Sequence, residues 1–359
     1  MERRLGNRPA SGRPVGLPCR LEMGEIDSRR QELMTLINGF WASQAVITFS
    51  FLGLPALMGS GLRTSTELAR ATGTDAAALR RLLRALAALG VVDEAGPEEF
   101  ALSQLGEGLL PDAPGSLAGW AALMGTPNIW QNWGQLAQSI RTGKTGWELR
   151  LGTDAWTYRA QHPEEGKIFD LAMVSATGAT TGALVDAYDF SRFATIVDVG
   201  GGQGTLLGAI LQRHPSLTGV LFDQAQVVEG APELLGRLGV LDRCQVVAGS
   251  FFESVPSGGD AYLLKSVIHD WYDREASQIL AVVRQAMRPG AVLLLVERVL
   301  EPAGLGSSAK LGDLNMLVNP GGMERTEEEY SRLLEASGFR LDRVVGAPDQ
   351  PSVLESTSV

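Results

Sequence analysis

The sequence predicts an α/β protein in which a doubly wound, mostly parallel sheet follows a helix-rich domain. Three observations predict this fold. Short apolar runs alternate with helical stretches from Phe193 onward, a glycine turn at 198–204 joins one such run to an apolar helical pattern, and residues 116–185 show long helical patterning. The 359 residues exceed one ordinary hydrophobic core. We therefore expect two domains, at 23–185 and 186–359, after a tail at 1–22.

The N-terminal segment is predicted to be a disordered tail followed by apolar helices. Residues 1–22 are rich in arginine and proline and show no apolar periodicity. Between Asp27 and about Leu57, apolar side chains recur at helical spacing over a wide face; they are Leu33, Leu36, Ile37, Phe40, Trp41, Ala45, Val46 and Phe49. A face of this width requires a large partner, and a second subunit is the simplest one. We expect a homodimer formed through these helices.

A winged-helix layout follows. Thr64-Ser65-Thr66-Glu67 has the spacing of a capping box, Gly73 ends that short helix, and a leucine stripe predicts a second helix over about 79–89. A short acidic hairpin then extends to Leu102. DNA binding is the functional alternative, but four carboxylates on the hairpin would repel phosphates; they are Asp93, Glu94, Glu98 and Glu99.

Composition narrows the functional classes further. The formal net charge of −10 disfavours nucleic acid and anionic lipid as partners. The two cysteines, Cys19 and Cys244, are far apart in sequence, which suits a reducing cytoplasm. No uninterrupted apolar stretch reaches the length of a membrane helix, and no apolar signal core follows Met1. We expect a cytoplasmic protein without a membrane segment.

The region before the sheet is rich in tryptophan. Five tryptophans fall within 116–185, at Trp120, Trp130, Trp133, Trp147 and Trp156. They could line a flat apolar pocket or simply fill the core, and for each one singly these alternatives are equally favoured.

From Phe193 onward the sequence pattern is that of successive βαβ units. Strands are predicted near 195–199, 218–222, 245–247, 261–265 and 291–298, and helices near 204–213, 231–238 and 273–287. Ligands of such sheets bind beyond the carboxyl ends of the strands.

The glycine turn predicts a bound nucleoside. Gly200, Gly202 and Gly204 alternate, which differs from the G-x-G-x-x-G spacing of dinucleotide sites. Asp223 follows nineteen residues after Gly204, at the end of an apolar run, where a carboxylate can accept both hydroxyls of a ribose. A nucleoside without a phosphate chain fits both observations.

Ionisable residues follow the later strands. Lys265 ends 261–265, His269 and Asp270 come just after it, and Glu297 follows the apolar run 293–296. His269 could take a proton at neutral pH if a carboxylate orients its other ring nitrogen; a buried histidine bonded to a backbone carbonyl is the structural alternative. Glu297 is the first candidate for that carboxylate.

Two later glutamates receive different predictions. Glu329 completes capping-box spacing with Thr326, so we expect it to be structural. Glu324 follows the loop 319–322, which can return it to the rim of the sheet. We expect His214 to cap a helix end and His162 to begin a helix. No group of His, Cys, Asp and Glu has metal-ligand spacing, so no metal is predicted.

Together these motifs resemble the S-adenosylmethionine-dependent small-molecule O-methyltransferases, which include plant caffeic acid and flavonoid enzymes and bacterial polyketide-tailoring enzymes. The resemblance rests on 198–204, Asp223, 249–252, Lys265 with 269–271, Glu297 and 319–326. It covers nearly the whole chain from about Asp27. It implies a Rossmann-like class I methyltransferase domain preceded by a winged-helix dimerisation domain.

The resemblance also implies roles for individual residues. Gly200 and Gly202 would hold the methionine portion of S-adenosylmethionine, Asp223 the ribose, and Phe251 with its neighbours Gly249 and Ser250 the adenine; Lys265 would reach toward the amino-acid end. Many relatives carry Asp where this chain has Ser250, which puts that adenine contact in doubt. His269 would be the general base, with Glu297 and Glu324 holding its ring. Four residues match positions that line the acceptor pocket, namely Phe169, Met173, Met316 and Asn319.

The expected reaction is methyl transfer to a hydroxyl, phenolic in our interpretation, of a small aromatic natural-product intermediate. Because the sulfonium is a good methyl donor, the protein must chiefly align the acceptor oxygen with the methyl group and exclude water. Some relatives use the cofactor only structurally during hydroxylation, decarboxylation or rearrangement. That alternative stays open here, and a winged-helix DNA-binding regulator is a third.

Overall fold

The computed structural model describes residues 23–59, 61–302, 308–346 and 350–359, with side chains from residue 27 onward. The predicted tail at 1–22 and Cys19 lie outside the described residues. The chain divides into two compact units, Met1–Gln44 and Ala45–Val359. The predicted domain boundary at 185/186 stays a prediction.

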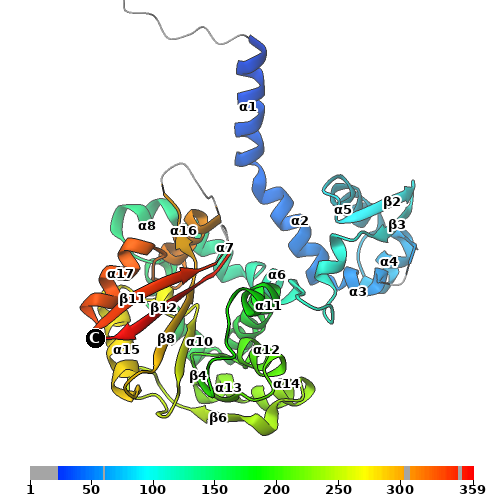
Figure 1. The fold of residues 1–359 in the computed structure, drawn as a ribbon. Helices are drawn as coiled ribbons and strands as arrows, with labels where there is room; N and C mark the ends of the chain where they lie inside the picture. The colour runs from blue at the N-terminus through cyan, green and yellow to red at the C-terminus, as the bar shows by residue number, and fades with distance from the viewer. Residues whose placement is uncertain (1–22, 60, 303–307, 347–349) are drawn as a thin grey trace, which may run out of the picture. The chain divides into compact units, whose positions relative to one another are not determined.

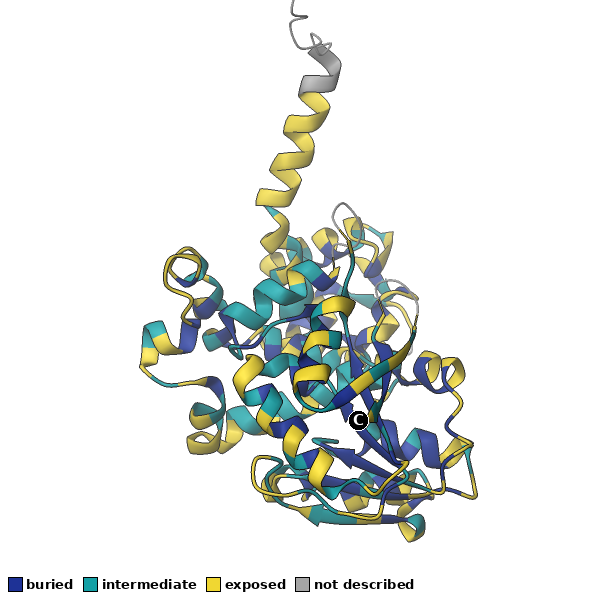
Figure 2. Cartoon of the chain, turned by 60° about the vertical axis from the view of Figure 1, so that its left-hand side comes forward, coloured by how far each residue is buried: buried dark blue, intermediate teal, exposed yellow. Residues whose placement is uncertain are grey.

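The N-terminal helices expose many large apolar side chains to solvent. The predicted pattern forms α1 (Met23–Ile37), α2 (Gly39–Phe51) and α3 (Leu54–Met58). From residue 27 onward, α1 is coloured as exposed in Figure 2. The exposed large apolar side chains of α1 and α2 are Leu33, Met34, Leu36, Ile37, Phe40, Trp41 and Phe51. Such an apolar surface is typical of an interaction face.

The winged-helix prediction is confirmed. A capping box between Thr64 and Glu67 begins α4 (Ser65–Thr72), and Gly73 ends it with φ of 67°. Helix α5 (Ala76–Ala88) packs on α4, and the strands β1 (Arg63–Thr64), β3 (Glu99–Leu102) and β2 (Val92–Gly96) form a small sheet in that order.

Helices then lead to the large sheet. They are η1 (Gly106–Leu109), α6 (Ala118–Met124), α7 (Pro127–Trp133), α8 (Leu136–Thr142), α9 (Gly146–Leu151), α10 (Ala155–Gln161) and α11 (Pro163–Ala187). His162 joins α10 to α11, as predicted. Among the described helices, α11 alone is long and apolar enough to cross a bilayer by length and composition. Here it contacts α6, α10 and α12.

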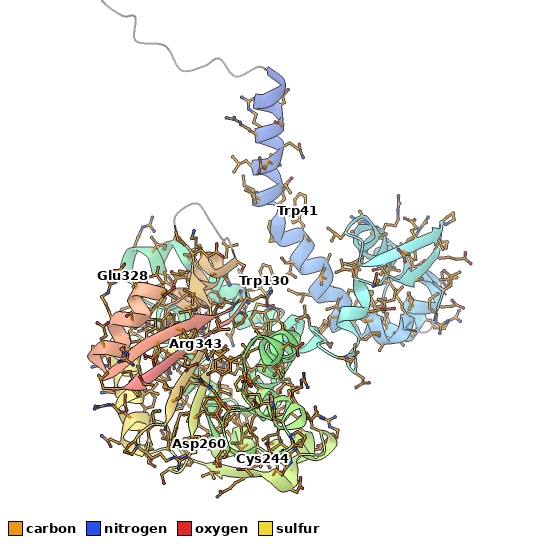
Figure 3. The ribbon with its side chains drawn as sticks, in the orientation of Figure 1. Trp41, Trp130, Cys244, Asp260, Glu328 and Arg343 are labelled. Atoms are coloured by element: carbon orange, nitrogen blue, oxygen red, sulfur yellow. The ribbon has the colours of Figure 1, made fainter. Side chains whose placement is uncertain are left out.

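The C-terminal part is a seven-stranded sheet in the order β11-β12-β8-β7-β4-β5-β6. The predicted strands are confirmed within one or two residues as β4 (Thr195–Val199), β5 (Thr218–Asp223), β6 (Cys244–Ala248), β7 (Ala261–Lys265) and β8 (Val292–Glu297), all parallel. Two further strands, β11 (Phe339–Val345) and β12 (Ser352–Ser358), were not predicted; they add an antiparallel edge. Cys244 and Asp260, labelled in Figure 3, mark the amino-terminal ends of β6 and β7.

Helices cover both faces of this sheet (Figure 1). Apolar residues of α11, α12 (Thr205–Arg213) and α14 (Ala231–Arg237) pack on one face, and those of α15 (Asp273–Ala286) and α17 (Glu327–Ala336) pack on the other. Successive strand residues alternate between the two cores: Ile196 and Leu294 lie in one, Val197 and Leu295 in the other. The doubly wound prediction is confirmed.

The remaining elements are short or follow the sheet strands. They are α13 (Ala225–Val228), η2 (Leu241–Arg243), η3 (Ile268–Asp270), β9 (Val299–Leu300), α16 (Ser308–Val318) and β10 (Arg325–Thr326). His214 forms the C-cap of α12, and Glu329 closes a capping box with Thr326 at α17, both as predicted.

Candidate active site

The carboxyl ends of the five parallel strands form one rim, because neighbouring strands run in the same direction in adjacent register. Most of the candidate residues follow these ends. They are Gly200 and Gly202 after β4, Asp223 at β5, Gly249, Ser250 and Phe251 after β6, Lys265 and His269 at β7, and Glu297 at β8.

The glycine turn has backbone angles that residues with a side chain rarely adopt. Gly200 and Gly202 have φ of 71° and 62°, in the left-handed region. A Cβ on Gly200 would lie 2.7 Å from Val267 Cγ2, whereas one on Gly202 would meet nothing within 4 Å. Val267 therefore packs against the turn at Gly200, whereas no atom packs against it at Gly202. A ligand can approach the backbone of the turn at Gly202.

Asp223 is fixed by the turn itself. Its Oδ2 accepts the N–H of Gly202 at 2.8 Å, and its Oδ1 accepts the N–H of Gln224 at 2.7 Å. Burial raises the pKa of this carboxyl. Each oxygen keeps a second lone pair, so the carboxylate could still accept the two hydroxyls of a ribose.

The end of β6 is joined to Asp223. Gly249 donates its N–H to the Asp223 carbonyl at 2.9 Å, and a Cβ there would lie 2.5 Å from the Phe222 ring. Ser250 follows and accepts the N–H of Phe252 through Oγ at 3.3 Å. The Phe251 ring approaches the position of a Cβ on Gly200 to 3.6 Å. The aromatic ring of Phe251 therefore lies beside the glycine turn.

Asp198 provides an orphaned carboxylate under the same turn. It is 1% exposed, and its Oδ1 has no hydrogen-bond partner among the described residues. Burial, reinforced by repulsion from Asp223, raises the pKa of Asp198 to about 7, although Lys265 opposes this rise. A buried oxygen without a partner suits a ligand that brings a donor. The open turn, Asp223 and this oxygen together fit a nucleoside that carries an amino-acid group.

Lys265 lies at the rim but is turned toward α11. Its Nζ donates to Thr177 Oγ1 at 3.2 Å and to Ser266 Oγ at 3.3 Å. Burial lowers its pKa, while Glu297 and Asp198 favour the charged form. Ser266 has φ of 53°, a strained value for a residue with a side chain.

His269 lies within a group of carboxylates. Its Nδ1 is 3.1 Å from Glu324 Oε1 and 3.5 Å from Glu297 Oε2, and its Nε2 is 3.7 Å from Asp270 Oδ1. Because carboxylate oxygens only accept, the neutral ring carries its hydrogen on Nδ1 and keeps a lone pair on Nε2. The three residues predicted to act together are thus in one cluster.

Glu297 also holds the backbone that carries the histidine. Its Oε1 accepts the N–H groups of Val267 at 3.1 Å and Ile268 at 2.8 Å, the two residues before His269. Burial raises the pKa of Glu297 to about 7, although His269 opposes this rise. Removing the side chain would therefore disturb both the charge and the position of the imidazole.

The carboxylates change the proton affinity of the imidazole. Burial disfavours the charged ring, but Glu297, Asp270 and Glu324 outweigh burial and raise the pKa of His269 to about 10. Burial raises the pKa of Asp270 to about 6, against the attraction of His269 and Arg159. The carboxylates therefore favour the protonated form of the imidazole.

The loop before β10 explains how Glu324 reaches this cluster. A Cβ on Gly322 would lie 1.9 Å from the His269 carbonyl oxygen, so only glycine permits this close approach. Met323 then donates its N–H to the same carbonyl at 2.8 Å. Glu324 is the next residue, and its own N–H is held by Asp313 Oδ1 at 2.9 Å.

The four acceptor-pocket candidates lie on α11, on α16 and directly after α16. Phe169 meets the Trp156 ring edge-to-face, with centroids 5.6 Å apart, and Met173 packs in an apolar cluster with Leu123, Ile129 and Ala172. Met316 lies on α16 with an intermediate exposure. Asn319 is 3% exposed and accepts the Nδ2–H of Asn132 through Oδ1 at 3.2 Å.

The tryptophans predicted either to line a pocket or to fill the core have different environments in the structure. Trp147 is 1% exposed and is core. Trp156 stacks on Trp271 at 5.8 Å and so reaches the residue that follows Asp270. Trp271 and Arg325 lie in the motifs 269–271 and 319–326, but no role was predicted for either of them, and Arg159 was not predicted at all. Position could have drawn attention to Trp271 and Arg325, which directly follow Asp270 and Glu324; nothing local identifies Arg159.

The cluster of His269, Glu297 and Glu324, called the base cluster for its predicted role, could by donor type alone also hold a metal ion. One donor atom each from His269, Glu297 and Glu324 lies within 4.8 Å of the others. A proton on Nδ1 satisfies the 3.1 Å contact to Glu324 without a cation. The expectation that no metal is needed stays a prediction.

The sheet order and the position of the rim are those of the class I methyltransferase fold, and the family comparisons agree. Residues 133–340 match the O-methyltransferase domain, and residues 34–112 match the O-methyltransferase dimerisation domain. The chain belongs to this family of O-methyltransferases. Its methyl donor is S-adenosylmethionine, and it is of the type found in antibiotic and natural-product biosynthesis.

Named relatives cover nearly the whole chain. The mitomycin biosynthesis 6-O-methyltransferase of Streptomyces lavendulae is 40% identical over 86% of this chain and 88% of its own. The 3-amino-4-hydroxybenzoate 4-O-methyltransferase of Streptomyces cremeus is 38% identical over 92% and 91%. The solved O-methyltransferase from neocarzinostatin biosynthesis, in complex with S-adenosylmethionine and 2-hydroxy-5-methyl naphthoic acid, is 32% identical over 89% and 96%, with a TM-score of 0.73.

Proposed function

We propose that this enzyme methylates a phenolic hydroxyl of a small aromatic natural-product intermediate, with His269 as the general base. The observation that carries the proposal is the 3.1 Å contact of His269 Nδ1 with Glu324, which leaves Nε2 as the proton acceptor. A phenol attacks poorly while protonated, since its pKa is about 10. Glu297 and Glu324 are positioning residues that hold the ring through Nδ1.

The raised proton affinity of the imidazole suits this acceptor. An ordinary imidazole of pKa about 6.5 is a weaker base than a phenolate by about 3 to 4 pKa units, so proton transfer to it is uphill by about 4 to 5 kcal/mol. With the pKa of His269 raised to about 10, the transfer becomes nearly balanced. As the pH rises, the neutral imidazole, which is the form that accepts the proton, becomes more abundant.

The relatives support an aromatic acceptor. Hydroxybenzoate and naphthoic acid appear in the descriptions of two of them. Here Phe169, Trp156 and Trp271 form a connected row of rings, which ends two residues after His269. For the methyl donor, we propose that Gly200 and Gly202 hold the methionine portion and Asp223 the ribose. Phe251, with Gly249 and Ser250, would border the adenine, and Lys265 would lie toward the amino-acid end. Phe169, Met173, Met316 and Asn319 would line the acceptor pocket.

The direct test is methyl transfer from isotopically labelled S-adenosylmethionine to a panel of phenols. We expect the product to gain one CH2 in mass and to carry the label on oxygen. A labelled nitrogen would make the chain an N-methyltransferase. An oxidised, decarboxylated or rearranged product without the label would favour the alternative in which the cofactor is structural. We place the enzyme in the cytoplasm, and DNA or membrane binding is not part of this proposal.

The pH dependence tests the carboxylate cluster. We expect kcat/KM of the wild type to rise with pH through neutrality, because only the neutral imidazole accepts a proton. Glu297→Gln keeps an oxygen for the N–H groups of Val267 and Ile268 but removes a charge. It should lower the pKa of His269 and move the rising limb down by about one pH unit or more. Steady-state kinetics from pH 6 to 10 measure this shift.

The matched control for that shift is Glu328→Gln, since the Glu328 side chain is 81% exposed. It should leave the limb in place. An unchanged limb in the Glu297→Gln variant would mean that His269 is not the group that titrates.

The dimerisation domain predicts a homodimer, and the exposed apolar face of α1 and α2 is the surface we assign to it. Light scattering should give twice the chain mass of 38.3 kDa. Replacing Phe40 and Trp41 by Asp removes apolar area from both copies at once. We expect the dissociation constant to rise by at least ~100-fold. Leu241→Asp, at an exposed leucine on η2, is the control and should remain dimeric. A wild-type mass equal to that of one chain contradicts the prediction.

A further inference from the structure

Arg159 on α10 lies among aromatic rings beside the base cluster. Its guanidinium carbon lies 3.8 Å from the centre of the Phe169 ring, 5.2 Å from Trp156 and 5.9 Å from Trp147. Phe169 is one of the acceptor-pocket candidates, and Trp156 stacks on Trp271 next to Asp270. The cation therefore belongs to the wall that adjoins the proposed acceptor site.

This guanidinium packs on aromatic rings, but the part of the chain that the structure describes offers it no hydrogen-bond acceptor. Within the described residues, its side chain forms no hydrogen bond and no ion pair within 4 Å, and Nη1 is inaccessible to solvent. The neighbouring carboxylates act on it only from a distance; they are Asp270, Glu165 and Asp170. Glu165 is engaged elsewhere, because its Oε1 accepts from Asn128 Nδ2 at 2.7 Å. A sequestered donor without an acceptor is rare in folded proteins.

The charge persists in spite of this environment. Burial lowers the pKa of Arg159 to about 10, with Asp270, Glu165 and Asp170 opposing the fall, so the group remains a cation at neutral pH. A cation packed against rings would gain most from an anion that reaches it through the acceptor site. The planar fork of arginine matches a carboxylate by two parallel hydrogen bonds.

We propose that Arg159 binds a carboxylate of the acceptor, so that the substrate is an aromatic hydroxy acid. The aromatic side chains would contact its ring, Arg159 its carboxylate, and His269 its hydroxyl. This inference rests on the proposed function for the identity of the ring and hydroxyl, and it adds the anionic group. Arg159 is thus a specificity residue, distinct from the proposed base.

The test uses binding, so that it does not depend on turnover. Full-length enzyme saturated with S-adenosylhomocysteine is titrated by calorimetry with hydroxybenzoic and hydroxynaphthoic acids, each paired with its neutral carboxamide. We expect at least one acid to bind about tenfold or more tightly than its amide. Arg159→Gln should abolish that preference while leaving affinity for the amide unchanged, and Arg159→Lys should keep part of it.

Controls separate this role from a structural one. Arg141→Gln removes an exposed positive charge on α8 and should keep the full preference for the acid. S-adenosylhomocysteine affinity and the unfolding midpoint report whether Arg159→Gln is folded, and Arg159→Met repeats the test with a similar side-chain volume. Equal losses for acid and amide would mean that Arg159 only packs against Phe169, and the inference would then be wrong. It would be equally wrong if no acid binds better than its amide.

The two proposals fail separately. A preference for acids that depends on Arg159, without methyl transfer to any of them, would leave this inference standing and overturn the proposed reaction. Equal methyl transfer to the acids and to their amides would support the proposed reaction and overturn the assignment of Arg159 to a substrate carboxylate.

Discussion

Replacing His269 by Ala should reduce kcat by a factor of about 10² to 10⁴ while leaving the affinity for S-adenosylmethionine close to that of the wild type. The factor is the usual contribution of a positioned base. Methyl transfer would continue slowly, since alignment of donor and acceptor does not need the imidazole. Calorimetry for the cofactor and single-turnover kinetics with a phenolic acceptor measure the two quantities independently.

Two further measurements make the His269 prediction specific. An acceptor with a more acidic phenol should lose less activity in the Ala variant, because its oxygen is already ionised at the assay pH. His214→Ala, at the C-cap of α12, is the matched control and should retain turnover. If the Ala variant keeps wild-type kcat with a phenol of ordinary acidity, His269 is not the base.

Most of the rim could be predicted because each of its parts is encoded locally. A buried parallel strand is a short apolar run, and the polar residue that ends it, such as Asp223 or Glu297, lies at the rim by topology alone. Glu324 was harder, since it lies far from its partner in sequence. It could be inferred from the loop 319–322, and the structure supplies the reason: Gly322 permits contact with the His269 carbonyl.

The features that escaped prediction depend on partners distant in sequence. Strand β12 buries Glu355 and Ser356, so it lacks an apolar run. Its glutamate is held by Arg192, Arg343 and the Tyr188 hydroxyl, none of which is near it in the chain. The position of Arg159 likewise depends on how α10 packs, with Trp156 stacked on Trp271 more than a hundred residues later in the chain. Neither arrangement leaves a periodic signal in the sequence.

Arg325 is the other residue whose replacement should have a large effect. It is 1% exposed and joins the segments that carry the base cluster. Its guanidinium donates to the carbonyls of Ile268 at 3.3 Å, Trp271 at 2.9 Å and Met323 at 3.4 Å, and to Asp273 Oδ1 at 3.0 and 2.8 Å. One side chain thus ties η3, which holds His269, to the loop that holds Glu324.

Arg325→Met should lower the free energy of unfolding by about 3 to 5 kcal/mol, because it leaves the buried carbonyl of Ile268 and the partly buried carbonyls of Trp271 and Met323 without this donor. Urea unfolding followed by tryptophan fluorescence measures the change. Arg332→Met removes an exposed pair with Glu328 and should change stability by about 0.5 kcal/mol or less. A loss below about 1 kcal/mol for Arg325→Met would mean that water replaces the guanidinium.

The catalytic consequence of Arg325 follows from the same contacts, and it separates positioning from simple loss of fold. At a temperature where Arg325→Met is still fully folded, Glu324 should no longer be held against Nδ1 of His269. The rising limb of the pH profile should then move to lower pH, as in Glu297→Gln, since the imidazole loses part of its carboxylate environment. Arg325→Lys keeps the charge but cannot reach three separated carbonyls with one ammonium group, so it should behave as an intermediate. A destabilised variant with an unmoved limb would assign Arg325 to stability alone.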